Sequence, residues 1–130
     1  MLPNSHLETS TRLCGAPVAL RPGYAHVRMH TCREMVVDAH GLVHGGFVFG
    51  QADYAAMLAV NDPNVVLGAA QTRFLAPVPC GAVLDAEATV RGSVGRKRHV
   101  SVTVHHNDRA VFEGEFTCFV LNHHILTPPP

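Results

Sequence analysis

One carboxylate, Asp53, stands in a stretch of sequence that is otherwise nearly free of charge. The residues around it, from Phe47 to Val60, read Phe-Val-Phe-Gly-Gln-Ala-Asp-Tyr-Ala-Ala-Met-Leu-Ala-Val. This pattern predicts a helix that is apolar nearly all round and is therefore wrapped by other structure. An ionised carboxylate buried there without partners is unfavourable by roughly several kcal/mol, so such a group usually has a raised pKa, is paired or takes part in chemistry. Asp53 is thus a candidate general base or nucleophile, and the alternative is a core carboxylate whose hydrogen bonds are satisfied.

The motif His44-Gly45-Gly46 comes directly before this segment. Two glycines at the start of a helix leave the N–H groups of its first turn uncovered by side chains, at the positive end of the helix dipole. Such N–H groups could bind the negative charge that forms on a carbonyl oxygen under attack, each donor contributing about 3 kcal/mol. His44 could orient this loop or donate a hydrogen bond to the reacting group, and the alternative is a histidine that only packs against the loop backbone.

The composition indicates one globular domain. The chain has 130 residues, of which 47% are hydrophobic, so it can bury one core but is too short for two domains. Its ten acidic and ten basic side chains balance, which argues against nucleic-acid binding through bulk charge. The four cysteines include no C-x-x-C pair. The N-terminus lacks the pattern of a signal peptide and no apolar run could span a bilayer, so we expect a reduced, cytoplasmic protein that binds neither nucleic acid nor a membrane.

Ten histidines raise the question of a metal site. His40 and His44 are four residues apart, but Gly41 separates them in a segment that reads as a loop, so they need not share a face. The adjacent pairs His105-His106 and His123-His124 would point in opposite directions on a strand. We therefore expect no metal.

Two segments are expected before the helix. Residues 1–22 form an N-terminal segment, in which Ser5 and Glu8 have the spacing of a capping box before a short helix. Residues 24–37 are rich in valine, threonine and methionine, which predicts an extended strand or a bent pair of strands.

Four strands are expected after the helix, which Asn61 should cap because Pro63 forbids its continuation. They are a β-rich run and three runs with alternating apolar residues, over 65–74, 84–90, 100–104 and 110–120. Turn signals separate them, so they should be half-buried antiparallel strands joined by short hairpins. An apolar helix between antiparallel strands predicts an α+β domain over 23–122, in which a curved sheet wraps the helix, followed by a disordered tail over 123–130.

The motifs, in this order of elements, resemble those of a known family. His44-Gly45-Gly46 stands at the helix start, Asp53 follows nine residues after that histidine, and Asn61 follows eight residues later. The strand end Phe74-Leu75-Ala76-Pro77 and the strand start Gly81-Ala82-Val83-Leu84 add to the pattern. From about Tyr24 to Val120 the chain strongly resembles the hotdog-fold acyl-CoA thioesterases of the phenylacetyl-CoA and 4-hydroxybenzoyl-CoA type. This resemblance implies a hotdog fold and hydrolysis of an acyl-CoA thioester to a free acid and coenzyme A.

The resemblance also implies roles for the helix start and the carboxylate. The Gly45 N–H, with Gly46 beside it, would bind the thioester oxygen, and Asp53 would act as base or nucleophile. Within one helix these groups are about 12 Å apart along the axis, so one thioester cannot touch both. A site that uses both needs Gly45 from one protomer and Asp53 from another, which two antiparallel helices in a twofold dimer supply twice. We therefore expect a homodimer with two shared sites, pairing further into a homotetramer, and an inactive monomer.

Two positions depart from the family pattern. Six residues before the histidine, where many relatives carry Asn or Gln, the chain has Asp38, which cannot donate a hydrogen bond when ionised. Asp38 could face Asp53 across the dimer and titrate with it, or could be a solvated turn residue. Relatives often place Ser or Thr early on the strand after the helix, whereas the nearest substitutes here are Gln71 and Thr72, one of which could line the site.

Four basic residues surround one predicted hairpin, namely Arg91, Arg96, Lys97 and Arg98. They could bind the phosphates of coenzyme A, and the alternative is a set of solvated hairpin charges. The sequence contains no Gly-x-Gly-x-x-Gly or Walker-type loop, so coenzyme A is expected only as part of the substrate and no separate cofactor is expected. The leading interpretation is a cytoplasmic acyl-CoA thioesterase. An acyl-CoA-binding sensor or carrier without turnover, and a hydratase or dehydratase on the same fold, are the alternatives.

Overall fold

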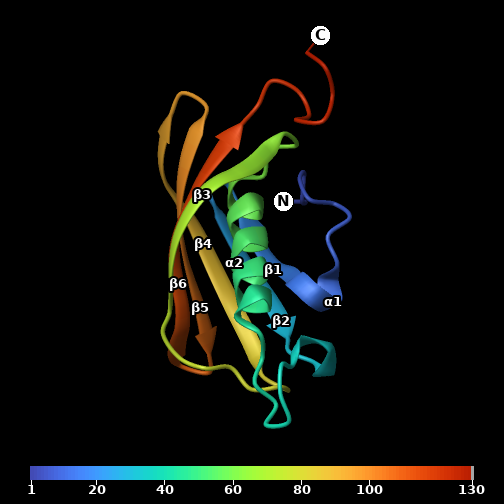
Figure 1. Ribbon diagram of the computed structural model, residues 1–130. Helices are drawn as coiled ribbons and strands as arrows, with labels where there is room; N and C mark the ends of the chain where they lie inside the picture. Colours follow the sequence, from blue (N-terminus) through green and yellow to red (C-terminus); the bar gives the residue numbers. More distant parts are fainter. Residues whose placement is uncertain (130) are drawn as a thin grey trace.

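Six antiparallel strands form one curved sheet that wraps around the helix α2 (Gly45–Val60), as Figure 1 shows. The computed structural model describes residues 1–129. The strands are β1 (Ala16–Arg21), β2 (Tyr24–His30), β3 (Val65–Phe74), β4 (Val83–Val94), β5 (Lys97–His106) and β6 (Arg109–Val120). A short helix, α1 (Thr11–Cys14), precedes them, and a 3₁₀ turn (Arg33–Met35) follows β2. The predicted α+β hotdog fold is confirmed.

The strand order across the sheet is β1-β2-β4-β5-β6-β3. Two predicted hairpins are present, because β4 turns into β5 at Gly95 and β5 turns into β6 at Asn107, with left-handed φ angles of 58° and 55°. The expected hairpin between β3 and β4 is wrong, because β3 pairs with β6 and β4 pairs with β2. The segment 75–82 crosses between the two parts of the sheet instead. Its turn residues mark where a strand ends, but not which strand is its partner.

The core lies between α2 and the concave face of the sheet. Alternation on the strands is as predicted, since Val100, Val102 and Val104 of β5 are buried, as are Phe112 and Phe116 of β6. The helix is buried on most of its circumference: from Gln51 to Ala59, every residue except Asp53 is buried. A helix that is apolar nearly all round must be buried on most sides, and α2 is buried in this way.

Asn61 ends α2 and also anchors the N-terminal segment. It has a left-handed φ of 55°, and its backbone N–H donates to the Met57 carbonyl at 2.8 Å, so the predicted capping role is confirmed. Its side-chain Oδ1 accepts from the Asn4 N–H at 2.7 Å, and its Nδ2 donates to the Leu2 carbonyl at 3.1 Å. One amide side chain thereby ties the first residues of the chain to the end of the central helix.

The N-terminal segment differs from the sequence prediction. Helix α1 begins after Ser10, whose hydroxyl accepts from the Leu13 N–H at 3.2 Å, so Ser5 is not its cap. Ser5 is buried, and its hydroxyl contacts His6 Nδ1 at 2.6 Å instead. Strand β1 then pairs with β2, so the sheet already begins at Ala16, within the segment 1–22.

Residues 24–37 hold one strand, β2, and the short 3₁₀ turn rather than a bent pair of strands. Disorder of the tail over 123–130 stays a prediction, since the structure describes residues 123–129, partly as turns, and Pro130 lies outside the described residues. Among the helices within residues 1–129, none has the length and apolar composition needed to cross a membrane.

Gln51 fixes the helix to the sheet through its side-chain amide. The residue is fully buried, and its Nε2 donates to the Val27 carbonyl on β2 at 3.1 Å and to the Leu84 carbonyl on β4 at 2.8 Å. Two neighbouring strands and the helix therefore meet at one polar group, which sets how α2 sits on the sheet.

We expect Gln51→Ala to lower the free energy of unfolding by about 2–4 kcal/mol, because it leaves two buried carbonyls without that donor and opens a cavity. Chemical denaturation followed by circular dichroism measures the change. Gln71→Ala, at an exposed position of β3, is the matched control and should change stability by less than about 0.5 kcal/mol. Equal effects of the two variants would contradict the anchoring role of Gln51.

Candidate functional site

The start of α2 presents a backbone N–H that is not engaged by the protein. His44 is the N-cap: its backbone is extended, with φ −63° and ψ 131°, and its Nδ1 accepts a hydrogen bond from the Gly46 N–H at 2.7 Å. Because Nδ1 is an acceptor, the neutral imidazole carries its proton on Nε2. Gly45 is the first helical residue, and its N–H has no hydrogen-bond partner among residues 1–129. Of the two glycine amides, that of Gly45 is the one free to bind an anionic oxygen.

The two glycines make room for this geometry. A Cβ on Gly46 would lie 2.8 Å from His44 Nδ1, so a side chain there would displace the cap. A Cβ on Gly45 would lie 3.0 Å from Cε1 of the Phe74 ring, so a side chain there would need the ring to move by a few tenths of an ångström. The motif His44-Gly45-Gly46 therefore caps the helix with little space for side chains and leaves the Gly45 N–H without a hydrogen-bond partner in the described residues.

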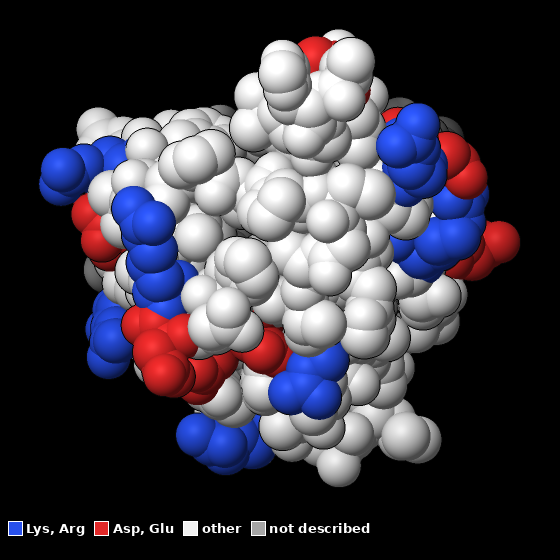
Figure 2. Space-filling view, turned by 90° about the horizontal axis from the view of Figure 1, so that it is seen from below, with Lys and Arg blue, Asp and Glu red and all other residues white. Residues whose placement is uncertain are grey.

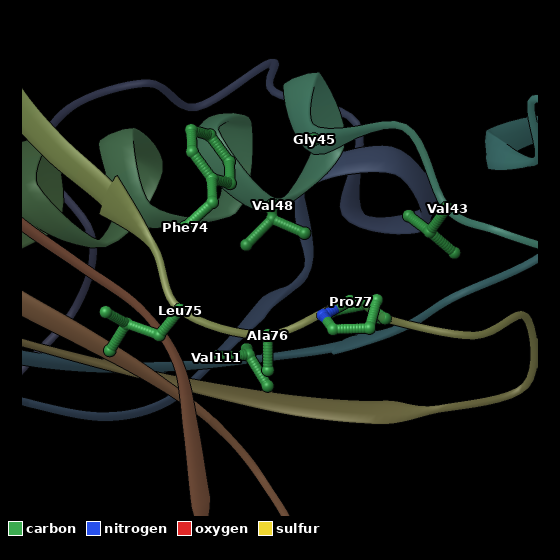
Figure 3. Close-up of a pocket in the computed structure, with 9 residues that line it drawn as sticks. Val43, Gly45, Val48, Phe74, Leu75, Ala76, Pro77 and Val111 are labelled. Atoms are coloured by element: carbon green, nitrogen blue, oxygen red, sulfur yellow. The ribbon is translucent and has the colours of Figure 1, made fainter.

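An apolar pocket of about 270 Å³ opens beside Gly45. Figure 3 shows its side chains between the start of α2 and the chain that leaves β3. Its floor consists of four buried valines from separate segments, Val43, Val48, Val78 and Val111. Its rim includes Phe74, Leu75 and Pro77. Sequence reasoning identifies Phe74 to Pro77 only as a strand end, because no local pattern shows that a crossing segment will pass the helix start.

Figure 2 views the end of the molecule at which α2 begins. A broad area at the centre of this face carries neither Lys and Arg nor Asp and Glu, with charged side chains directly below it and at the two sides in Figure 2. Exposed apolar side chains at this end include Leu42, Phe74 and Leu75. The side chains that line the pocket, Phe74 and Leu75 among them, are all uncharged.

Asp53 lies on a side of α2 that the sheet covers only in part. Phe49, one turn earlier on the helix, packs against Phe112 and Phe116 of β6, and burial followed by the Asp53 charge raises the pKa of the Cys118 thiol on the same strand, so this side of α2 faces β6, the neighbour of the edge strand β3. One carboxylate oxygen of Asp53, Oδ1, is buried and has no hydrogen-bond partner among the described residues. Burial raises the pKa of the Asp53 carboxyl to about 6. The Asp53 charge in turn adds to the effect of burial in raising the pKa of the Cys14 thiol.

Asp53 and Gly45 do not meet within one chain. They are separated by eight residues of continuous helix, which corresponds to about 12 Å along the axis. The residues that line the pocket beside Gly45 come from α2, β3, β6 and two connecting segments, and Asp53 is not one of them. The helix thus carries the bare N–H at its tip and the unpartnered carboxylate in its middle.

Asp38 forms a turn in this chain. Its Oδ1 accepts from the His40 N–H at 2.9 Å and from the Leu42 N–H at 3.2 Å, and the residue is exposed. This is the geometry of the turn-residue alternative. The same turn holds the loop that leads from β2 to the cap at His44.

Gln71 and Thr72 point to opposite faces of β3. Thr72 pairs with Gly114, which lies between the buried Phe112 and Phe116, so Thr72 is on the concave side. Gln71 pairs with the exposed Glu115 and lies on the convex side. Of the two predicted substitutes for the strand hydroxyl, Thr72 shares the face on which α2 packs.

The basic hairpin lies at the other end of the molecule from Gly45. Arg91, Arg96 and Lys97 are exposed, and Arg98 donates from Nη1 to the carbonyls of Gly95 and Lys97 at 2.8 and 3.1 Å. In Figure 1 this β4–β5 turn is at the top of the view, with the end of α2, whereas the start of α2 is at the bottom. One chain does not bring these charges to the pocket.

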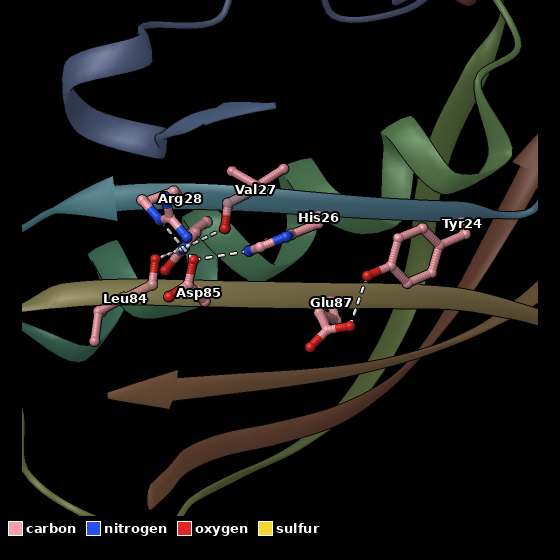
Figure 4. A network of polar contacts seen from close by, with 8 residues as sticks. Tyr24, His26, Val27, Arg28, Leu84, Asp85 and Glu87 are labelled. Carbon is pink, nitrogen blue, oxygen red and sulfur yellow. Dashed lines mark hydrogen bonds and ion pairs between the residues drawn. The ribbon is translucent and has the colours of Figure 1, made fainter. Parts of the chain in front are cut away.

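A polar network on the convex face escaped sequence reasoning, because its members are far apart in the chain. Figure 4 shows that His26 and Arg28 of β2 both reach Asp85 of β4, at 2.7 and 2.8 Å from its Oδ1. Burial alone would raise the pKa of Asp85, but the hydrogen bonds from His26 and Arg28 outweigh it and lower the pKa. Within residues 1–129, no three His, Cys, Asp or Glu side chains are grouped as metal ligands would be.

Comparison with known proteins gives one family match and several similar structures. Residues 40–113 match the sequence profile of the thioesterase superfamily. Uncharacterized protein PH1136 from Pyrococcus horikoshii has a similar crystal structure, with a TM-score of 0.95, 49% identity and coverage of 98% of this chain and 100% of that one. A mutant of the phenylacetic acid degradation protein PaaI from Thermus thermophilus is 29% identical, with a TM-score of 0.78 and coverage of 84% and 95%. A hypothetical thioesterase from Streptococcus pneumoniae TIGR4, solved with coenzyme A, shares the fold at 19% identity, a TM-score of 0.76 and coverage of 84% and 87%.

Curated relatives are longer proteins. The chain is 46% identical over 119 residues to methylthioribose-1-phosphate isomerase from Aquifex aeolicus (strain VF5), matching 91% of this chain and 26% of that protein. It is 33% identical over 89 residues to Transcription factor FapR from Shouchella clausii (strain KSM-K16), matching 68% of this chain and 47% of that protein. The chain therefore spans about a quarter and about half of the length of these two relatives.

The raised pKa of Asp53 predicts a pH-dependent stability. Since the folded-state pKa of about 6 exceeds the ordinary value of 3.8, the fold favours the protonated form, and stability is lost as the pH rises through about 6. Asp53→Asn removes this penalty. We expect it to raise the free energy of unfolding by roughly 2–3 kcal/mol at about pH 8 and by nearly nothing at about pH 4.

Urea denaturation of both proteins across this pH range measures the difference. Asp108→Asn, in the exposed turn between β5 and β6, reports the effect of removing a surface carboxylate. A stabilisation by Asp53→Asn that is the same at all pH values would contradict the burial of an ionised Asp53.

Proposed function

We propose that this chain, which belongs to the thioesterase superfamily, hydrolyses an acyl-CoA thioester to a free acid and coenzyme A. The observation that carries the proposal is the pairing of two unsatisfied groups on one helix: the free Gly45 N–H beside an apolar pocket, and the Asp53 carboxylate with a buried, unpartnered oxygen in the described structure. A donor at a pocket and a carboxylate with a raised pKa are the two groups that acyl transfer to water requires. The coenzyme A in the Streptococcus pneumoniae relative supports the substrate class.

In this proposal each site is shared between two copies of the chain. The 12 Å separation along the helix, by rough estimate, prevents one thioester from touching both groups of one chain. Strand β3 is the outer strand of the sheet next to β6, and its middle residues Gly68, Ala69 and Ala70 are small and exposed. A second copy placed against this edge by a twofold axis would pair the free strand edge and set two α2 helices side by side. Asp53 lies on the side of α2 that faces β6, the strand next to this edge, so in this arrangement it would reach the partner's pocket.

The chemistry then follows from the two groups. A water molecule attacks the thioester carbonyl carbon while the ionised Asp53 takes a proton from that water. The Gly45 N–H donates a hydrogen bond to the carbonyl oxygen, which becomes negatively charged. The C–S bond breaks, and the sulfur of coenzyme A leaves and recovers the proton. Alternatively Asp53 attacks the carbon itself and the C–S bond breaks, so that the thiolate of coenzyme A leaves and an anhydride forms; water then hydrolyses the anhydride to the free acid and the Asp53 carboxylate. Both routes need the ionised carboxylate of Asp53. In both, His44 caps the helix and so keeps the Gly45 N–H in position.

The basic hairpin has a place in the shared site. The β4–β5 turn lies at the same end of the molecule as the end of α2. In a dimer of antiparallel helices, that end of one chain lies beside the start of α2 in its partner. Arg96 and Lys97 of the partner subunit would then be nearer to the pocket than those of the same chain, where phosphates of coenzyme A could meet them. Tetramer formation and a cytoplasmic location stay predictions.

A second candidate function is binding of acyl-CoA without turnover. The 33% identity to a transcription factor, FapR, favours it, because that relative carries a similar unit in a longer chain. The carboxylate of Asp38 in place of an amide points the same way. The two functions differ in one measurement: a binding domain would bind acyl-CoA, by calorimetry, and release no free thiol from it.

Variants at the two groups should abolish turnover with the fold intact. Gly45→Pro removes the N–H, and the fold can accept it, because proline is favoured at the first helical position and the ψ of 131° at His44 suits a residue before proline. Gly45→Ala adds a similar Cβ but keeps the N–H. We expect Gly45→Pro to lower kcat by about 10²–10³-fold and Gly45→Ala by far less.

Asp53→Asn should lower kcat to the background of the assay while an acyl-CoA thioether still binds. Free-thiol release measures turnover, and circular dichroism checks the fold of each variant. Wild-type rates in Asp53→Asn, or equal rates in the two Gly45 variants, would overturn the assignment.

Charge reversal at the hairpin, Arg96→Glu with Lys97→Glu, should raise KM by about tenfold or more and leave kcat nearly unchanged, because these residues would bind phosphate and not the reacting atoms. Reversal of another exposed cation, Arg33→Glu, is the control. A kcat effect larger than the KM effect would argue against phosphate binding there.

A further inference from the structure

We propose that the acyl group accepted by this site is small, apolar and uncharged, and that Phe74 limits its length. The inference rests on the proposed thioesterase function, since it names the substrate class of the same site. It follows from the chemistry of the pocket beside Gly45, which the family match and the similar structures do not specify.

The acyl side of the thioester is the part that suits this pocket. When the carbonyl oxygen lies at the Gly45 N–H, the two substituents of the carbonyl carbon are the acyl group and the sulfur of the pantetheine arm. That arm carries amides, which need hydrogen-bond partners when they leave water. Among the side chains that line the pocket within residues 1–129, none is polar or ionisable. The acyl group therefore enters the pocket and the arm stays outside.

The same lining selects against charge. The floor is made by the valine side chains of Val43, Val48, Val78 and Val111, each at most 5% exposed. A carboxylate at the far end of a dicarboxylic acyl group would lose its water against this floor and gain no side-chain donor from the lining of this chain. A hydrocarbon chain or an unsubstituted aromatic ring has no comparable hydration to lose when it enters the pocket.

Phe74 stands where the pocket meets the surface. Its ring lies 3.0 Å from the position of a Cβ on Gly45, and it contacts Phe112 edge-on with ring centroids 5.1 Å apart. Phe74 is 56% exposed, whereas Phe112 is fully buried. The ring thus rests on the core on one side and closes the space over the helix start on the other, so it forms a wall that an acyl chain of greater length would meet.

The volume agrees with a small group. The part of the site that one chain supplies measures about 270 Å³, near the lower end of the range of about 300–1,000 Å³ for pockets that enclose drug-sized ligands. The structure therefore favours hexanoyl-CoA or phenylacetyl-CoA over dodecanoyl-CoA for length, and over succinyl-CoA for charge.

Free-thiol release from these four thioesters tests the proposal in the wild-type protein. We expect kcat/KM for hexanoyl-CoA to exceed that for succinyl-CoA by at least about 100-fold, and that for dodecanoyl-CoA by at least about tenfold. Turnover of succinyl-CoA at the rate of hexanoyl-CoA would overturn the charge argument and leave the thioesterase function standing.

Two variants test the residues. Phe74→Ala should raise the dodecanoyl-to-hexanoyl ratio of kcat/KM by about tenfold or more. Val18→Ala, at an exposed apolar position on the opposite edge strand β1, should leave this ratio unchanged.

Leu75→Arg places a guanidinium at the rim and should raise the succinyl-to-hexanoyl ratio of kcat/KM by about tenfold or more, with Leu75→Gln as the uncharged control. Unchanged ratios in both Phe74→Ala and Leu75→Arg would overturn the assignment of the pocket.

Failure of the proposed function gives a different result. If the wild-type protein releases thiol from none of the four thioesters, hydrolysis is refuted, and the pocket is then tested by binding alone. Calorimetry with the hexanoyl and succinyl thioether analogues of coenzyme A should still show at least about 100-fold tighter binding of the hexanoyl compound. Equal affinities would overturn the inference.

Discussion

The burial of α2 against the curved sheet is the interaction on which the rest of this structure depends. A helix that is apolar on nearly every side needs cover, and six antiparallel strands supply it. The cover is incomplete in two places. At its first residue the helix has an N–H without a hydrogen-bond partner, and near its middle the Asp53 carboxylate has a buried oxygen without a partner among the described residues. The proposed chemistry uses the Gly45 N–H and the Asp53 carboxylate. Because a rigid helix keeps these two groups apart, a site that uses both requires a second copy of the chain.

Two polar residues of the same helix show how burial separates structure from function. The amide nitrogen of Gln51 has partners on two strands, at 3.1 and 2.8 Å, and holds the helix in place, while its amide oxygen is buried without a partner in the described residues but carries no full charge. Asp53, two positions later, has a buried oxygen with no partner in the described chain and a pKa raised to about 6. A buried carboxylate without partners destabilises the fold, and selection for stability alone would replace it. Its presence is best understood if the carboxylate has a chemical role at an interface.

Much of the fold could be predicted because its signals are local. The long apolar helix, the cap at Asn61 and the alternating valines of β5 all follow from residues a few positions apart, and the structure confirms them. The crossing of 75–82 could not be predicted, since pairing of β3 with β6 is a long-range choice that turn residues do not encode. For the same reason the pocket could not be predicted: Val43, Val78 and Val111 converge only after the chain has crossed. The motif at His44-Gly45-Gly46 was recognisable, but the use of the Gly46 N–H by the cap became visible only in three dimensions.

Subunit complementation tests the shared site most directly. Gly45→Pro and Asp53→Asn chains, each inactive alone, are unfolded, mixed in equal amounts and refolded together. Half of the dimers are then mixed, and each mixed dimer holds one site with both lesions and one with neither, so roughly a quarter of the wild-type activity should return. If the N–H and the carboxylate instead served one site within one chain, every site would carry a lesion. A refolded mixture no more active than its parents would contradict the account.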